Sequence, residues 1–430
     1  MINSGIEWIG EIPENWKLEK LQWHLTEVKE TNNPEKTRQI LSLTNTRGVI
    51  PYEEKGEQGN KAKEDYTQYK LAYPNTIVAN SMNVLIGSVG KCEYFGCVSP
   101  VYYVFKPNEG ENIDFLNYIF QTQQFQKELR RYANGILEIR LRVSSDDILK
   151  RHVAIPPIDI QEKIVEVIQQ KLHQIDQLID NQDDQIERLK QYKQKIISEL
   201  VLGRELSNPD LFADKNLSAN LPDGYSIYPL KRLFKLNKGL PITKENLVSS
   251  GVKVISYGQV HAKYNDSVYT NEELYRFVNE GYLDTNDESL TKVNDFIFAD
   301  TSEDLAGIGD CVRITEEDKI FAGYHSIILK ANKPEYSHYF SYLFLSDEWR
   351  NQFRVKASGV KLFSLTQKML SQGIVIFPSI DKQFEITKVL DKKCADIKRL
   401  IEIKQEKIEK LIEYKKSLIY EYVTGKKQVA

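Results

Sequence analysis

The chain has 430 residues, of which 41% are hydrophobic and 28% charged, and its net charge is −3. This length predicts roughly two to four domains. No apolar run reaches the ~18 residues that a membrane-spanning helix needs. The segment Met1-Ile2-Asn3-Ser4 lacks the basic and apolar regions of a signal peptide. We therefore expect a cytoplasmic protein without a membrane partner.

The cysteine and histidine content argues against a disulfide framework or a metal site. The four cysteines, Cys92, Cys97, Cys311 and Cys394, are scattered along the chain, and this usage is typical of a reducing compartment. Cys92 and Cys97 could begin a metal site, but no Cys or His pair at finger spacing completes it. The prediction is that these thiols are reduced, that they lie in the core and that no metal is bound.

Residues 1–155 form the first predicted block. It opens with Ile12-Pro13-Glu14-Asn15-Trp16, and strand-like runs follow at 39–43, 76–80, 84–89 and 101–106. An aromatic-rich helix is predicted over 114–132. A mixed α/β domain of this size can bury a core of its own.

Polar and basic side chains of this block are candidates for binding DNA. They lie in the loop after the first strand and near the end of the aromatic-rich helix, and they comprise Asn45, Thr46, Arg47, Arg130, Arg140 and Arg142. Amide and guanidinium groups can read base edges in the major groove, and cations can reach phosphates. An ordinary turn and a solvated basic surface are the alternative interpretation.

Residues 156–206 predict one long helix. Asp159 stands where an N-cap is expected, and Gly203 is the type of residue that favours a helix end. About 44 helical residues give a rod of roughly 66 Å. Apolar residues recur in heptads, a coiled-coil pattern that Gln182 and Lys193 interrupt; its positions are Ile168, Leu172, Ile175, Ile179, Ile186 and Leu189. An amphipathic helix lying on a globular core is the alternative.

Residues 207–377 form a second block with the same ground plan. It opens with Leu221-Pro222-Asp223-Gly224-Tyr225, predicts strands at 253–257, 296–300 and 326–330, and predicts a helix over 336–355. The corresponding loop and helix end supply further DNA-binding candidates, namely Gln259, His261, Lys263, Arg354, Lys356 and Lys361. Two blocks with one plan suggest a two-part target.

Residues 378–430 repeat the first long helix. Pro378–Gly425 aligns with Pro156–Gly203 without a gap, with 19 identities in 48 positions, and Asp381 and Gly425 match Asp159 and Gly203. The predicted heptad seam contains Leu390, Ile397, Ile401, Ile408 and Leu411. This helix has a net charge of +4, which predicts attraction to the acidic first helix, a solvated lysine-rich face or contact with phosphates.

The predicted fold class is α+β. Two mixed α/β domains are joined by two long antiparallel coiled-coil helices in a pseudo-two-fold internal repeat. The antiparallel arrangement follows if the two helices pair about a two-fold axis, and the helices would then act as a spacer.

The motifs of the common DNA-modifying and nucleotide-using enzymes are absent from the sequence. There is no GxxxxGK[ST] loop, no GxGxxG after a predicted strand, no [DN]PP[YFW], no compact nuclease carboxylate core, no HExxH and no nucleophile elbow. We therefore predict no catalytic residues.

The opening Ile12-Pro13-Glu14-Asn15-Trp16-Lys17-Leu18, its echo at 221–225, and the proline-rich entry to a helix with Asp159-x-Gln161-Glu162 resemble the DNA specificity (S) subunits of type I restriction–modification systems. The second copy departs from that pattern at Phe384, where the family usually has Glu. The resemblance extends over nearly the whole chain.

The resemblance implies two target-recognition domains that each read one half of a bipartite site in double-stranded DNA. It also implies spacer helices that fix the gap and dock two methyltransferase (M) subunits. In that family the S subunit is not an enzyme and holds no cofactor. S-adenosylmethionine belongs to the M subunits, which methylate an extruded adenine, and restriction (R) subunits add cleavage, with ATP and Mg in the full complex.

Two other classes remain open from the sequence. A coiled-coil scaffold that binds only proteins predicts no sequence-selective DNA binding. A self-contained restriction or methylation enzyme predicts activity of the isolated chain.

Overall fold

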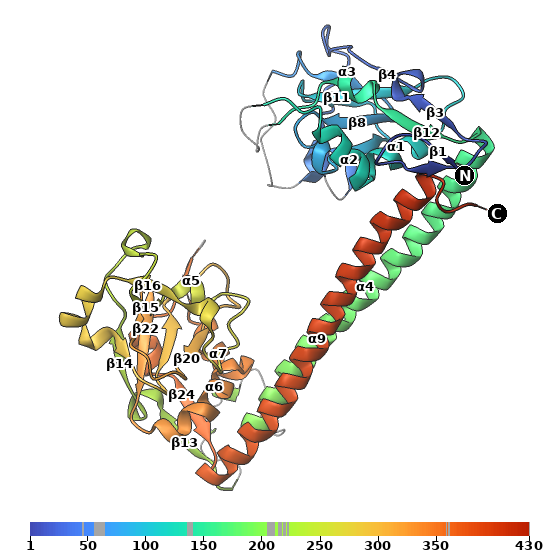
Figure 1. The fold of residues 1–430 in the computed structure, drawn as a ribbon. Helices are drawn as coiled ribbons and strands as arrows, with labels where there is room; N and C mark the ends of the chain where they lie inside the picture. Colours follow the sequence, from blue (N-terminus) through green and yellow to red (C-terminus); the bar gives the residue numbers. More distant parts are fainter. Residues whose placement is uncertain are drawn as a thin grey trace. The chain divides into compact units, whose positions relative to one another are not determined.

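The structure is a computed structural model that describes residues 1–44, 47–55, 65–135, 141–203, 211–213, 217, 221, 223–357, 359 and 362–429. The chain forms two compact units, which are residues 1–183 with 404–430 (unit 1) and residues 184–403 (unit 2) (Figure 1). Two long helices, α4 (Ile158–Leu202) and α9 (Ile380–Val423), each contribute one segment to both units. No helix among the described residues has the length and apolarity that a membrane span requires.

Unit 1 is built on a four-stranded antiparallel sheet. Its order is β4 (Leu25–Glu27), β11 (Tyr102–Pro107), β8 (Thr76–Asn80) and β9 (Val89–Cys92). The other strands pair as β1 (Ile2–Asn3) with β2 (Glu11–Ile12), β3 (Lys17–Lys20) with β12 (His152–Ile155), β5 (Leu41–Thr44) with β6 (Gly48–Pro51), and β7 (Lys70–Ala72) with β10 (Gly96–Val98). All five residues of β8 are buried, so the core lies on both faces of the central strands.

Three short helices cover this part of unit 1: α1 (Ile113–Gln121), α2 (Gln123–Arg130) and α3 (Ser145–Leu149). Aromatic residues from α1 and α2 share one apolar core with the first turns of α4 and the last turns of α9. Short 3₁₀ helices lie at Leu21–Trp23, Tyr52–Lys55 and Val84–Ile86.

Unit 2 contains an antiparallel sheet of the same type. Its order is β14 (Phe234–Lys238), β22 (Ser326–Ala331), β18 (Phe296–Ala299) and β20 (Cys311–Arg313). A second sheet of mixed direction has the order β16 (Arg276–Val278), β15 (Val252–Ile255), β21 (Ile320–Ala322) and β17 (Leu290–Thr291). The remaining pairs are β13 (Ser226–Pro229) with β24 (Ile374–Phe377) and β19 (Thr301–Ser302) with β23 (Phe363–Ser364).

The helices of unit 2 pack on these sheets. They are α5 (Tyr257–Val260), α6 (Ser337–Leu345), α7 (Asp347–Arg354) and α8 (Gln367–Ser371). Short 3₁₀ helices lie at Leu211–Ala213, Leu230–Arg232, Lys244–Asn246, Glu272–Leu274, Glu280–Asp284, Asp287–Ser289 and Pro334–Tyr336.

Both predicted aromatic helices are in fact pairs of helices. The expected helix over 114–132 breaks at Thr122, and the one over 336–355 breaks at Ser346. Each hydroxyl donates to a carbonyl three residues earlier, at 2.7 Å, and so competes with the backbone ladder. The resulting pieces have the same lengths in both units, 9 and 8 residues.

A side-chain contact is also repeated at these helix pairs. Gln126 Nε2 donates to the carbonyl of Phe120 at 3.1 Å, and Arg350 Nε donates to the carbonyl of Phe344 at 2.8 Å. In both units this hydrogen bond links a side chain of the second helix to a backbone carbonyl of the first helix, six residues earlier in the chain.

The long helices run antiparallel within each unit (Figure 1). In unit 1 Ile164 at the start of α4 shares a core with Leu418 near the end of α9. In unit 2 Val201 at the end of α4 shares a core with Leu390 near the start of α9. The amphipathic pattern thus buries its apolar side against the other helix and the adjoining block.

The residues at the predicted heptad positions are buried or half-buried along both helices. Ile168, Ile175, Ile186, Leu390 and Ile397 are buried, and Leu172, Ile179, Leu189, Ile401, Ile408 and Leu411 are half-buried. Gln182, which interrupts the apolar row, is itself only 5% exposed.

Some local predictions are wrong. The expected strand over 84–89 begins as the 3₁₀ helix Val84–Ile86, which ends at Gly87 in the left-handed region, with φ of 86°. Asp159 and Asp381 are not N-caps: they lie inside the first turns, because the helices start one residue earlier. A negative charge in a first turn still favours the helix dipole. The predicted terminal glycines are confirmed, since Gly203 and Gly425 have φ of 82° and 71°.

Candidate nucleic-acid interface

The first predicted reading loop joins β5 to β6. Asn45 and Thr46 lie outside the described residues, whereas Arg47 is described and exposed. Arg47 Nη2 lies 3.1 Å from a carboxylate oxygen of Glu54, and the Arg47 amide donates to Thr44 Oγ1 at 3.0 Å. The guanidinium is therefore held at the surface by an exposed ion pair that water and phosphates can replace.

The basic residues after α2 are only partly described. Arg130 is the last residue of α2 and is exposed, and Arg142 is also exposed. The backbones of Asn134 and Arg142 exchange two hydrogen bonds of 2.8 and 2.9 Å, so Arg142 lies beside the chain that leaves α2. Arg140 lies outside the described residues.

Two of the corresponding residues of unit 2, Gln259 and Arg354, form hydrogen bonds within the unit. Gln259 Oε1 accepts from the Ser256 amide at 3.2 Å as part of a capping box on α5. Arg354 is bonded to Asp347 at 2.7 Å and to the Ala306 carbonyl at 2.9 Å. Lys263 and Lys356 are exposed, and Lys361 lies outside the described residues.

Both ring nitrogens of His261 have partners. Nδ1 is 2.9 Å from an Asp310 carboxylate oxygen, and Nε2 is 2.9 Å from the Thr301 carbonyl. Burial lowers the pKa of His261, but the bonds to Asp310 and Thr301 outweigh it, so the net pKa lies above the ordinary 6.5. The His261 ring thus links Asp310 to the Thr301 backbone. His261 could contact a DNA base only if these hydrogen bonds broke.

The sequence did not indicate that Asp310 joins His261 to a buried arginine, Arg350. Arg350 is 8% exposed, and its Nη1 lies 2.6 Å from the Asp310 carboxylate. Asp310 therefore bridges Arg350 on α7 and His261 next to α5. No sequence signal joins three residues so far apart in the chain.

Two of the cysteines lie in the core of unit 1. Cys92 and Cys97 are fully buried, and burial raises the pKa of each thiol to about 11. No group of three or more Cys, His, Asp or Glu side chains suited to a metal occurs in the described part of the chain. The prediction that these two thiols lie in the core is confirmed.

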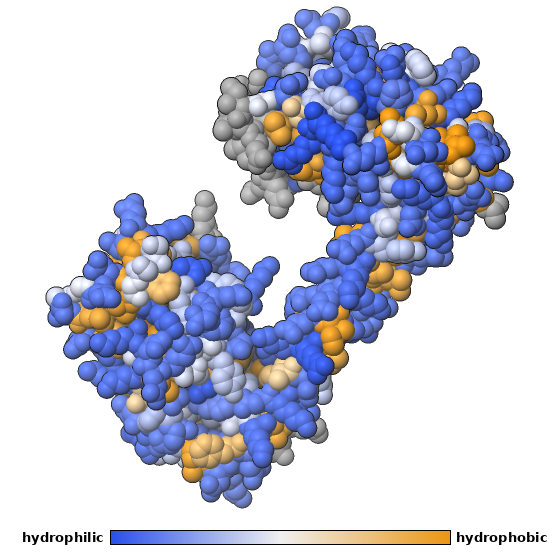
Figure 2. All heavy atoms as spheres, viewed as in Figure 1, coloured by the Kyte–Doolittle hydropathy of each residue, from blue (hydrophilic) through white to orange (hydrophobic). Residues whose placement is uncertain are grey.

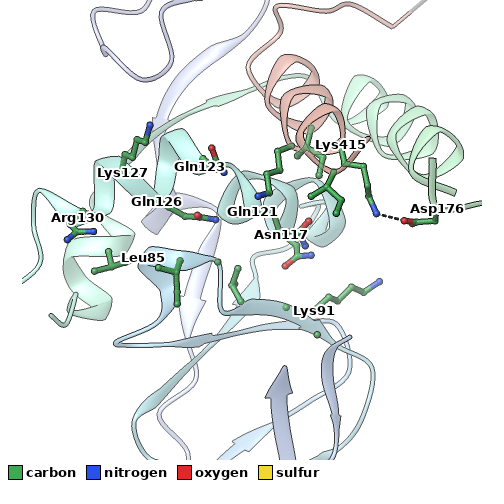
Figure 3. A pocket seen from close by; sticks show the side chains of 18 of the residues that line it. Leu85, Lys91, Asn117, Gln121, Gln123, Gln126, Lys127, Arg130, Asp176 and Lys415 are labelled. Carbon is green, nitrogen blue, oxygen red and sulfur yellow. Dashed lines mark hydrogen bonds and ion pairs between the residues drawn. The ribbon is translucent and has the colours of Figure 1, made fainter. Parts of the chain in front are cut away.

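A groove of about 1000 Å³ lies within unit 1, between α1 and α2 on one side and the long helices on the other (Figure 3). Its lining comprises Gly48, Leu85, Ile86, Gly87, Val89, Gly90, Lys91, Asn117, Gln121, Gln123, Gln126, Lys127, Arg130, Asp176, Ile179, Ile412, Lys415, Lys416 and Ile419. The lining thus holds five cationic side chains and one carboxylate, so its charge is suited to an anionic ligand.

Comparison with known proteins gives one family match over part of the chain and structural matches over nearly all of it. Residues 222–413 match the type I restriction modification DNA specificity domain. No curated protein matches the chain in sequence. A chain of a type I R-M system, solved to explain complex assembly and conformational transition, is 11% identical, with a TM-score of 0.70 over 96% of this chain and 98% of that one. The HsdS subunit from Thermoanaerobacter tengcongensis is 12% identical, with a TM-score of 0.52 over the same shares.

These structural matches establish a shared fold over nearly the whole chain. The family match covers most of the second block and the larger part of α9. Residues 222–413 therefore form a type I restriction modification DNA specificity domain, as the resemblance predicted for this part of the chain.

Proposed function

We propose that each unit reads one half of a bipartite DNA site and that α4 and α9 set the gap between the halves. The observation that carries this proposal is the repeated plan. Both units have an antiparallel four-stranded sheet and a helix pair of 9 and 8 residues. A pseudo-two-fold repeat divides the chain into recognition domains at 1–155 and 207–377 and spacer helices at 156–206 and 378–430.

The side chains proposed to contact DNA are the exposed ones of each block. In unit 1 these are Arg47, Arg130 and Arg142, and in unit 2 they are Lys263 and Lys356. Cations on this kind of surface bind phosphates in any sequence, and specificity comes from those that reach a base edge.

Two M subunits are proposed to dock on the helix pair. Leu178 and Leu400 occupy equivalent repeat positions and are 45% and 46% exposed, and Tyr192 and Tyr414 are 51% and 48% exposed. Apolar side chains remain on the surface of the helices (Figure 2). Identical exposed apolar residues in both copies fit two equivalent copies of one partner, because interfaces are enriched in such anchors.

The chain is proposed to be non-catalytic and to act in the cytoplasm. S-adenosylmethionine would be bound by the M subunits, and R subunits would supply the ATP- and Mg-dependent steps. Purified chain should neither methylate nor cleave DNA. Methyl transfer by the homogeneous chain without partners would contradict this division of roles.

The test of the reading function is a block exchange. Replacing residues 1–155 with the same region of another S subunit should change one half-site and leave the other unchanged, as seen by mapping methylated sites in cells that express the M partner. A simultaneous change in both half-sites would refute modular reading. If no site preference existed in any arrangement, the scaffold alternative would hold instead.

A further inference from the structure

We propose that the unit 1 groove binds phosphates of duplex DNA without regard to sequence, next to the half-site that unit 1 reads. This inference rests on the proposed function. It assigns sequence-independent phosphate binding to Arg130 and adds Lys127 and Lys416, which are not among the proposed reading residues. The ligand is the sugar–phosphate backbone.

The charges of the groove are arranged so that three cations remain available. Lys415 is paired with Asp176 at 2.5 Å, and Lys91 is paired with Asp114 and Glu93, each at 3.1 Å. The other three, Lys127, Arg130 and Lys416, form no ion pair with any described residue. The single carboxylate that lines the groove is thus already neutralised.

The uncompensated cations come from both walls. Gln123, Lys127 and Arg130 lie three to four residues apart on α2, so they share one face of that helix (Figure 3). Lys416 stands on α9 at the opposite wall. Cations on two facing walls can contact successive phosphates of one DNA strand that lies along the groove. A flat basic patch would not select one direction for the strand.

The groove is continuous with the proposed reading loop. Gly48 lines the groove and pairs with Thr44 across the β5–β6 turn, which carries Arg47. Arg130, the last residue of α2, also lines the groove. A duplex whose base edges are read by this loop therefore brings its neighbouring phosphates to the groove.

In unit 2 the corresponding helices, α4 and the α6–α7 pair, are joined by direct hydrogen bonds. Gln194 Nε2 donates to the Leu345 carbonyl, and Ser198 Oγ donates to the Glu348 carboxylate, both at 2.6 Å. By the repeat spacing, Lys416 stands in unit 1 where Gln194 stands in unit 2. The same helix face is thus used for packing in unit 2 and offers an unpaired cation in unit 1.

The test compares the full chain with Lys127→Gln/Lys416→Gln. Both side chains are exposed, so folding should be retained, and equal thermal unfolding would verify this. Binding to the mapped duplex and to an unrelated duplex is measured by fluorescence anisotropy over a salt series. The slope of log K against log[salt] should fall by ~1 for each lysine, by the same amount on both duplexes.

The matched control is Lys407→Gln/Lys410→Gln, which removes two exposed lysines of α9 that do not line the groove. It should leave the slope unchanged. A groove variant with an unchanged slope would overturn the proposal, as would a loss confined to assembly with the M subunit, which would mark the groove as a protein-docking site. A wild-type chain without preference for the mapped duplex would refute the reading function, and the slope would still decide the role of the groove.

Discussion

Asp176 of α4 and Lys415 of α9 are 239 positions apart in the chain, yet their carboxylate oxygen and ammonium nitrogen lie 2.5 Å apart. The pair links the first half of one helix to the second half of the other. It is the kind of contact that an antiparallel arrangement allows and a parallel one forbids.

This ion pair should contribute little to stability. The Asp176 side chain is 52% exposed, so Asp176→Asn should cost at most about 1 kcal/mol. Ile168→Ala, at a fully buried heptad position, should cost about 2–5 kcal/mol because it leaves a cavity. Urea unfolding of both variants checks this, and equal losses would contradict the view that the apolar seam holds the helices.

The two helix-terminal glycines should differ in their tolerance of alanine. Both have positive φ, so each substitution costs about 1–2 kcal/mol of backbone strain. At Gly425 an added Cβ would also lie 2.4 Å from Pro13 Cδ, whereas at Gly203 no described atom lies within 4 Å. Gly425→Ala should therefore lower the melting temperature more than Gly203→Ala does. The reverse order would show that the contact with Pro13 is absent.

The His261 network should make stability depend on pH. Because its folded pKa lies above 6.5, His261 contributes stability that is fully present below the unfolded pKa and is lost as pH rises through the folded value. The difference in unfolding free energy between wild type and His261→Gln should therefore shrink as pH is raised from about 6 through that value. A difference that grows with pH would show that the histidine is neutral in the folded protein.

Lengthening both helices should test their role as a spacer. One heptad inserted after Glu187 and one after Glu409, its repeat equivalent, keep the apolar register and add ~10 Å to each helix. That is roughly three base pairs at ~3.4 Å each. Methylation mapping should show the same half-sites with a wider gap. An active extended protein with an unchanged gap would exclude the spacer role.

Much of the architecture follows from the sequence because its determinants are local and periodic. Each long helix is specified by a heptad pattern and ended by a glycine, and β8 is specified by a run of strand-forming residues at Thr76–Asn80. The starts of α4 and α9 differ from the prediction, since the helices begin at Ile158 and Ile380 and so include the aspartates that were expected as N-caps.

The tertiary structure decided the rest, because side-chain partners are set by the fold and not by neighbours in sequence. Thr122 and Ser346 break their helices through hydroxyl bonds that a threonine or serine in mid-helix need not make. Composition marked His261 and Arg354 as possible readers. In the structure Asp310 and the Thr301 carbonyl hold His261, and Asp347 with the Ala306 carbonyl holds Arg354. The groove forms where α1 and α2 face the long helices, so Lys127 and Lys416, nearly 300 residues apart in the chain, line one groove because folding brings their helices to it.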